Sequence, residues 1–156
     1  MDKGKMGFGT VVVGVDFTMA SEAVAEWVGR HLPAVGTTVL VHALELSRHS
    51  GETSAQQQIR LEAAVSANES LERIAEEYFA DRAVELLVEP GDPISVLSTI
   101  AVEREADLIV VGPHQGHPAL EKFVGSTAQR LIHESIVPVL LAVGIGDAAL
   151  AESADA

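Results

Sequence analysis

Apolar residues follow two alternating patterns along the chain, one typical of buried strands and the other of amphipathic helices. Nearly continuous β-branched and aliphatic runs predict strands covered on both faces, as in a parallel sheet. Five such runs lie at 10–16, 39–44, 83–88, 107–112 and 137–143. Between them, apolar residues three and four positions apart predict four helices.

Capping residues predict where the helices begin. Thr18 or Ser21 can cap the first helix, and Asp92 followed by Pro93 is a strong start for the third. The second helix is expected over 56–80. Because strands and helices alternate strictly, we expect right-handed crossovers and an α/β fold class, a Rossmann-like open parallel five-stranded sheet with helices on both faces.

The 156 residues fit a single domain of ordinary size. We expect a flexible N-terminal arm at 1–8, a folded domain at 9–143 and a disordered acidic tail at 144–156. The chain has no cysteine. This excludes disulfides, thiolate nucleophiles and cysteine metal sites.

Charge and hydropathy argue against nucleic acid and membranes as partners. The chain has 23 acidic and 10 basic residues, a formal net charge of −13, so it repels phosphate backbones and nucleic-acid binding is not expected. No apolar run approaches the roughly 20 residues of a membrane span, and residues 1–5 lack the apolar core of a signal peptide. The sequence therefore predicts a cytoplasmic protein without membrane insertion. Composition leaves open whether the acidic surface reflects a saline environment.

Candidate chemistry lies where the first and fourth strands end. In open α/β sheets, ligands bind beyond the carboxyl ends of the strands, where the strand order reverses. The first strand ends at Asp16, and the fourth ends at Gly112 and leads to Gly125-Ser126-Thr127. The helix start at Ser126 either offers free N–H groups to a phosphate or is a simple cap. Asp16 is suited to capping the next helix, to binding a ribose or to holding a metal ion.

Five short motifs make the chain similar to a known family. They are Val15-Asp16-Phe17-Thr18, Val41-His42-Ala43, Gly91-Asp92-Pro93, the stretch from Gly112 to Gly125-Ser126, and Pro138-Val139-Leu140-Leu141. Over residues 10–143 the chain resembles the universal stress protein family. The resemblance implies the strand order 3-2-1-4-5 and a stand-alone, single-domain stress-response protein.

The nucleotide motif of that family is partly degenerate in this chain. Nucleotide-binding members carry a glycine, two residues, a second glycine, nine residues and then Gly-Ser or Gly-Thr, and the spacing from Gly112 to Gly125 matches. Gln115 stands where the second glycine belongs, and it brings a side chain into space that phosphates would use. Three alternatives therefore stay open. The protein binds ATP with Mg²⁺, it binds AMP, or it binds no nucleotide.

The resemblance also implies a set of site residues. The implied nucleotide-binding residues are Asp16, Thr18, Ala43, Gly112, His114, Gln115, Gly125, Ser126 and Thr127. Asp16 would lie near the adenosine and the backbone of Ala43 beside the adenine, while the glycines and hydroxyls would surround the ribose and phosphates. Each residue taken alone also has a plain structural role, and it is their joint spacing that favours a site.

We also expect a homodimer, an association that the resemblance implies as well. The fifth strand is apolar almost throughout and would lie at the edge of the sheet, where exposed backbone invites pairing. Pro138 limits hydrogen bonding near its start. The expected interface residues are Val139, Leu140, Leu141 and Ala142.

Three functions stay open at this point. The first is a stress-response module that senses an adenine nucleotide and acts through a regulatory protein partner. The second is an interaction module without nucleotide, for example a regulator of a transporter. The third is a slow ATP hydrolase or self-phosphorylating protein, with Ser126 or Thr127 near the transferred phosphate. The chain has neither a Gly-x-Ser-x-Gly elbow nor a Walker motif, so no catalytic residue and no metal site are assigned.

Overall fold

The computed structural model describes residues 7–32, 35–45, 51–113 and 126–145. Strands and helices alternate along these ranges, as the apolar pattern predicts. In chain order they are β1 (Phe8–Gly14), α1 (Met19–His31), β2 (Val35–Leu44), α2 (Ser54–Tyr78), β3 (Ala83–Pro90), α3 (Pro93–Glu103), β4 (Leu108–Val111), α4 (Ser126–Glu134) and β5 (Val139–Leu141).

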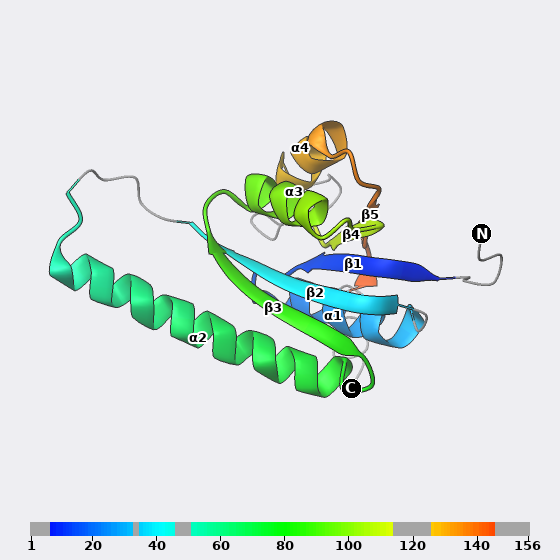
Figure 1. The fold of residues 1–156 in the computed structure, drawn as a ribbon, viewed down its shortest axis with the longest axis horizontal. Coiled ribbons are helices and arrows are strands. Elements are labelled where there is room, and N and C mark those ends of the chain that lie inside the picture. Colours follow the sequence, from blue (N-terminus) through cyan, green and yellow to red (C-terminus); the bar gives the residue numbers. More distant parts are fainter. Residues whose placement is uncertain (1–6, 33–34, 46–50, 114–125, 146–156) are drawn as a thin grey trace, which may run out of the picture.

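The five strands form one parallel sheet with the order β3-β2-β1-β4-β5, so the predicted order is confirmed. β1 lies at the centre, where Val13 pairs with Leu40 of β2 and with Val110 of β4. The helices α1 and α2 cover one face of the sheet, and α3 and α4 cover the other (Figure 1). Because all strands are parallel, each connection carries the chain back to the end of the sheet at which the strands begin.

Two apolar cores fill the space between the sheet and its helices. Val11 and Val13 belong to the core beneath α1 and α2, whereas Val12 belongs to the core beneath α3. All three valines are fully buried. A strand covered on both faces needs no polar alternation, and this is why the β1 sequence reads as an uninterrupted β-branched run.

The observed bounds differ from the predicted ones for every strand. β1 ends at Gly14 rather than at Asp16, β3 continues to Pro90 beyond the predicted 88, and β4 is Leu108–Val111, one residue shorter at each end than 107–112. β2 begins at Val35 rather than at 39, because Thr37 and Thr38 are extended and paired with β1 and β3 despite their hydroxyls. β5 is only Val139–Leu141, shorter than the predicted 137–143. The backbone before it forms a turn, in which the Ser135 hydroxyl donates to the carbonyl of Val137 at 2.7 Å. β1 begins at Phe8, within the segment predicted as an arm.

Local hydrogen bonds set the helix starts. Thr18 is the N-cap of α1, and its hydroxyl accepts from the N–H of Ser21 at 3.2 Å. Asp92 caps α3 as predicted, with Pro93 in the first turn. α2 begins at Ser54, earlier than the predicted 56, because Thr53 and Gln56 form a reciprocal capping box.

The end of α1 packs closely against the end of α2. At Gly29 an added Cβ would collide with the carbonyl oxygen of Tyr78, so only a glycine lets the two helices approach this closely. The Arg82 guanidinium, whose side chain is 6% exposed, donates to the carbonyls of Gly29 and Leu32 at 2.9 and 2.7 Å. A cation at the carbonyl end of a helix is favourable for the helix dipole.

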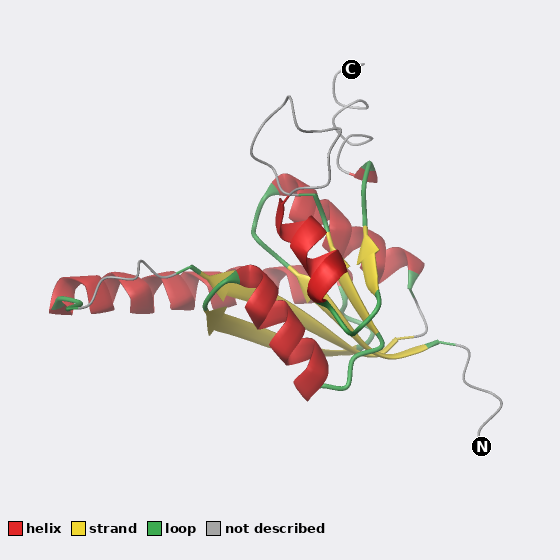
Figure 2. Ribbon diagram, turned by 90° about the horizontal axis from the view of Figure 1, so that it is seen from above, coloured by secondary structure: helices red, strands yellow, loops and turns green. Residues whose placement is uncertain are grey.

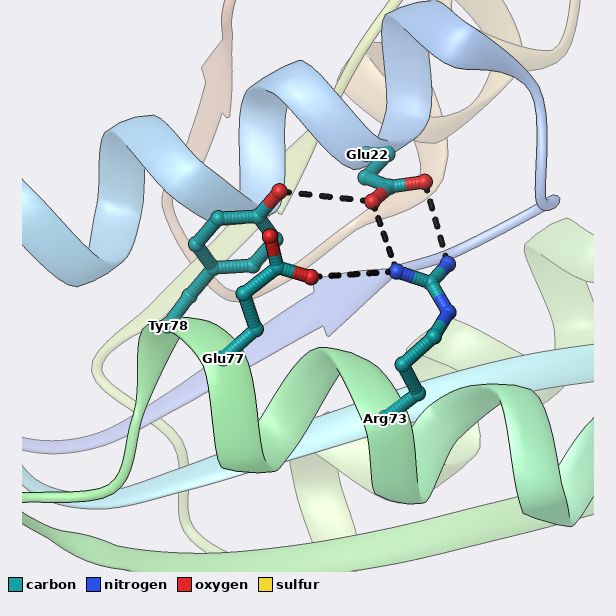
Figure 3. A network of polar contacts seen from close by, with 4 residues as sticks. All are labelled: Glu22, Arg73, Glu77 and Tyr78. Atoms are coloured by element: carbon teal, nitrogen blue, oxygen red, sulfur yellow. Dashed lines mark hydrogen bonds and ion pairs between the residues drawn. The ribbon is translucent and has the colours of Figure 1, made fainter.

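A polar network joins the beginning of α1 to the end of α2 (Figure 3). Arg73 donates to both carboxylate oxygens of Glu22, at 2.9 and 3.1 Å, and to Glu77 at 3.2 Å. The Tyr78 hydroxyl donates to Glu22 at 3.3 Å. The hydrogen bonds and charge of Arg73 hold the pKa of Glu22 below its ordinary value. Burial, together with the charges of Glu22 and Glu77, raises the pKa of Tyr78 to about 12.

This network predicts a measurable titration. The chain has a single tyrosine, so the ultraviolet absorbance of the phenolate reports on Tyr78 alone. We expect native protein to titrate with a pKa of about 12, and Glu22→Gln to lower that pKa toward the ordinary value. Because the pKa is raised in the folded state, the contribution of Tyr78 to stability is present below about pH 10 and is lost as the pH rises toward 12. Equal pKa values in the two proteins would contradict this role of Glu22.

Candidate functional site

A pocket lies at the carboxyl ends of the three central strands, β2, β1 and β4. Its volume is about 370 Å³, within the range of roughly 300–1,000 Å³ that small-molecule sites occupy. Its lining residues come from both faces of the sheet and from the loops that leave the strands. They are Gly14, Val15, Asp16, Ser21, Val41, His42, Ala43, Leu44, Glu45, Pro93, Leu97, Val111, Gly112, Pro113 and Leu131.

Asp16 sits at the rim of this pocket in a hydrogen-bonded turn. Its Oδ1 accepts from the N–H of Thr18 at 3.0 Å and from the Thr18 hydroxyl at 2.6 Å. The Ser21 hydroxyl in turn accepts from the N–H of Asp16 at 3.0 Å. Among the described residues, no hydrogen bond reaches Asp16 Oδ2. The turn thus engages Oδ1, and within the described part of the chain Oδ2 is available to a ligand.

Phe17, at the tip of this turn, has a strained backbone. Its φ of +63° is rare for a bulky side chain. The Phe17 ring packs against the His42 ring with centroids 4.4 Å apart, and His42 Nδ1 lies 2.7 Å from the carbonyl oxygen of Val15. Because a carbonyl only accepts, Nδ1 of His42 donates in this contact. This contact fixes the orientation of His42 in the pocket wall.

Ala43 and Gly112 lie on opposite walls of the same pocket. Ala43 belongs to β2, and Gly112 directly follows β4. A Cβ at Gly112 would lie 3.0 Å from Val24 Cγ2 of α1, so a side chain there would crowd the helix. The fold thus brings together Asp16, Ala43 and Gly112. Thr18 contributes to the Asp16 turn and to the cap of α1 but does not line the pocket.

The remaining residues of the predicted nucleotide site lie at or beyond the edge of the described structure. His114, Gln115 and Gly125 are outside the described residues. α4 begins at Ser126 and includes Thr127, and the side chains of these two residues are also outside the description. In the part of the chain that is described, no cluster of three metal-ligating side chains occurs.

The described lining of the pocket is apolar with a negative rim. Asp16 and Glu45 carry its carboxylates, and neither lysine nor arginine lines the described part. Leu97 and Leu131 bring α3 and α4 to the wall, and both are buried. Such a surface suits an uncharged ring with hydroxyl groups nearby better than a chain of phosphates. Sequence reasoning missed Phe17 and the wall from α3 and α4, since no local signal marks either.

A scan of protein-family models matches the universal stress protein family over residues 7–142. The chain belongs to this family. Comparison with curated proteins finds no match. Within the described residues of this universal stress protein, no helix is long and apolar enough to cross a membrane.

Solved structures of similar fold support the architecture. Hypothetical protein MJ0577 is 22% identical with a TM-score of 0.73, and the alignment covers 86% of this chain and 95% of that one. A universal stress protein in complex with cAMP is 20% identical with a TM-score of 0.65, covering 87% and 97%. An Arabidopsis thaliana family protein with AMP bound is 16% identical with a TM-score of 0.60, covering 85% and 90%. At these identities the likeness concerns the fold.

The edge strand of this universal stress protein is the place predicted for a dimer. β5 pairs only with β4 within the sheet, so it forms one edge. Val139, Leu140 and Leu141 are half-buried. Ala142 is buried, and its N–H donates to the carbonyl of Val111 at 2.9 Å. Any contact at this edge would therefore rest mainly on the three residues of the strand.

The cap at Thr18 predicts a stability effect. Thr18→Ala removes the acceptor for the Ser21 N–H and the donor to Asp16, and we expect it to lower the free energy of unfolding by about 1 kcal/mol in urea denaturation. Thr18→Ser keeps the hydroxyl and is the matched control, with stability close to native. Equal losses in both variants would show that the methyl group, rather than the cap, matters.

Proposed function

We propose that this universal stress protein is a stress-response module that binds an adenine nucleotide carrying few phosphates and acts through a protein partner. The observation that carries the proposal is the pocket at the ends of β2, β1 and β4. It combines apolar walls with one carboxylate oxygen of Asp16 that accepts no hydrogen bond from the described residues. We place the protein in the cytoplasm.

The pocket chemistry supports an adenosine. In this proposal the adenine packs between Ala43 and the apolar side chains of Leu97 and Leu131, which bury its faces. The ribose hydroxyls donate to Oδ2 of Asp16, forming charge-assisted hydrogen bonds. The Asp16 turn holds this carboxylate in place before a ligand arrives, so little ordering is required on binding.

The charge distribution favours a monophosphate over a triphosphate. Asp16 and Glu45 repel phosphates, and the chain as a whole carries −13. The start of α4 at Ser126 supplies backbone N–H donors and a positive dipole end, which suit a single phosphate. Gln115 replaces the glycine at which a triphosphate would approach the backbone. AMP and cAMP, which are bound in two proteins of similar fold, fit these constraints better than ATP.

A second candidate is a regulatory interaction module that binds no nucleotide. The observation that favours it is again Gln115, together with the carboxylates at the rim of the pocket. A slow hydrolase has less support. Asp16 is its evident base, and the turn already engages one of the two carboxylate oxygens of that residue.

Calorimetric titration with AMP tests the proposed site. We expect Asp16→Asn to weaken AMP binding about tenfold, because it loses a hydrogen bond to a charged acceptor. The asparagine keeps an oxygen for the N–H of Thr18, so the turn survives. Asp81→Asn is the matched control, since the Asp81 side chain is 77% exposed and outside the pocket. Native protein that binds neither AMP nor cAMP would favour the second candidate.

ATP with Mg²⁺ tests the role of Gln115. We expect native protein to bind ATP more weakly than AMP, and Gln115→Gly to raise the affinity for ATP while leaving that for AMP nearly unchanged. Tight ATP binding by the native chain, or no gain in the variant, would contradict this interpretation of Gln115. Mass spectrometry of natively purified protein would show which nucleotide travels with it.

We further propose a homodimer formed along β5. Leu141→Glu places a charge on the strand, and we expect it to convert the dimer to monomer in light scattering of dilute protein. Val102→Glu, at an exposed apolar position of α3, is the control that should leave the mass unchanged. An unchanged dimer in Leu141→Glu would move the interface away from β5.

A further inference from the structure

The N-terminal half of α2 extends past the ends of the strands, away from the other helices and strands that the structure describes (Figures 1 and 2). We call Ser54–Ser66 the α2 overhang. The buried residues of α2 are Ala67, Leu71 and Ile74, so burial begins only where the overhang ends. Thirteen residues of helix are about 20 Å long. A helix of this length standing alone is marginally stable in water.

The α2 overhang exposes large apolar side chains. Ile59, Leu61 and Val65 are 65%, 59% and 59% exposed. Leu61 and Val65 are four residues apart and therefore lie on one side of the helix. Ala64 lies between this side and the buried stripe that begins at Ala67. Leu61 and Val65 lie more than about 100° around the helix from the centre of the buried stripe, so they form a separate apolar side of α2. Nothing in the described part of the protein covers this side.

The net charge of the α2 overhang indicates which partner binds it. It carries one acid, Glu62, and one base, Arg60, and so is neutral. The rest of α2 carries Glu69, Glu72, Glu76 and Glu77 against Arg73 alone. Two copies of a chain with a net charge of −13 repel each other over most of their surfaces. A neutral, apolar helix face is where two such copies are able to meet.

We propose that the α2 overhang is a self-association surface, which pairs antiparallel with the α2 overhang of a second copy. The antiparallel direction follows from charge, because it places the two acidic bodies at opposite ends of the helix pair. A parallel pair would set the acidic halves of α2 side by side. The pairing is isologous, so one surface serves both copies. It is independent of β5, which lies at the opposite edge of the sheet from β3 and α2.

The interface is small, and its strength should reflect this. Interfaces that bury less than roughly 1,200 Å² are typical of transient contacts. We therefore expect association through α2 only at high protein concentration. It would add to any dimer that already forms in dilute solution.

Single-cysteine cross-linking tests the pairing directly, because the chain contains no cysteine of its own. Leu61→Cys lies near the middle of the α2 overhang, so antiparallel pairing brings the two thiols within reach of a short bis-maleimide. Glu72→Cys is the matched control. It is exposed on the same side of α2 three turns later, and its two copies would be about 30 Å apart along the pair.

We expect concentration-dependent cross-linked dimer for Leu61→Cys and essentially none for Glu72→Cys. Cross-linking of both variants would overturn the antiparallel arrangement, and cross-linking of neither would overturn the pairing itself. Sedimentation velocity gives a second readout without cysteines. Leu61→Glu combined with Val65→Glu should abolish the concentration-dependent increase in mass, whereas Val102→Glu, at an exposed apolar position of α3, should not. Equal behaviour of the two variants would overturn the pairing.

Discussion

The rest of the structure depends on one constraint, the pairing of β1 on both of its edges. β1 bonds to β2 on one side and to β4 on the other, while both of its faces are buried. The chain leaves β1 for α1 on one face of the sheet, whereas it leaves the neighbouring strand β4 for α4 on the other face. The carboxyl ends of β1 and β4 are therefore followed by helices on opposite faces, and the pocket lies where they part. The position of the site is therefore a consequence of topology, before any side chain contributes.

The shape of that pocket depends on a short strained turn. Phe17 adopts a positive φ because its neighbours hold it from both sides. The Asp16 and Thr18 side chains close the turn by hydrogen bonds, and the His42 ring supports that of Phe17. The same contacts that hold the strain also place Asp16 at the rim. The structural role of this aspartate uses Oδ1, and the ligand-binding role that we propose for it uses Oδ2.

Sequence patterns predicted the elements and the caps well, because each depends on neighbouring residues. The cap at Asp92 and the buried run of β1 are local features of this kind. The early start of β2 was missed because Thr38 is polar yet fully buried, and only its neighbouring strands decide that. Apolar periodicity revealed the length of α2 but not where the sheet beneath it ends. The contact of Phe17 with His42 joins residues 25 positions apart, beyond the reach of any local rule.

The buried guanidinium of Arg82 bears on how relatives of this chain should be compared. Its planar fork reaches two carbonyls of the last turn of α1 at once, at 2.7 and 2.9 Å. A lysine has one ammonium on a flexible stem and lacks this fixed fork, although the exchange is usually scored as conservative. An alignment column that holds lysine here would thus mark relatives in which the end of α1 is held differently. Divergence at such a position carries more structural information than the substitution score suggests.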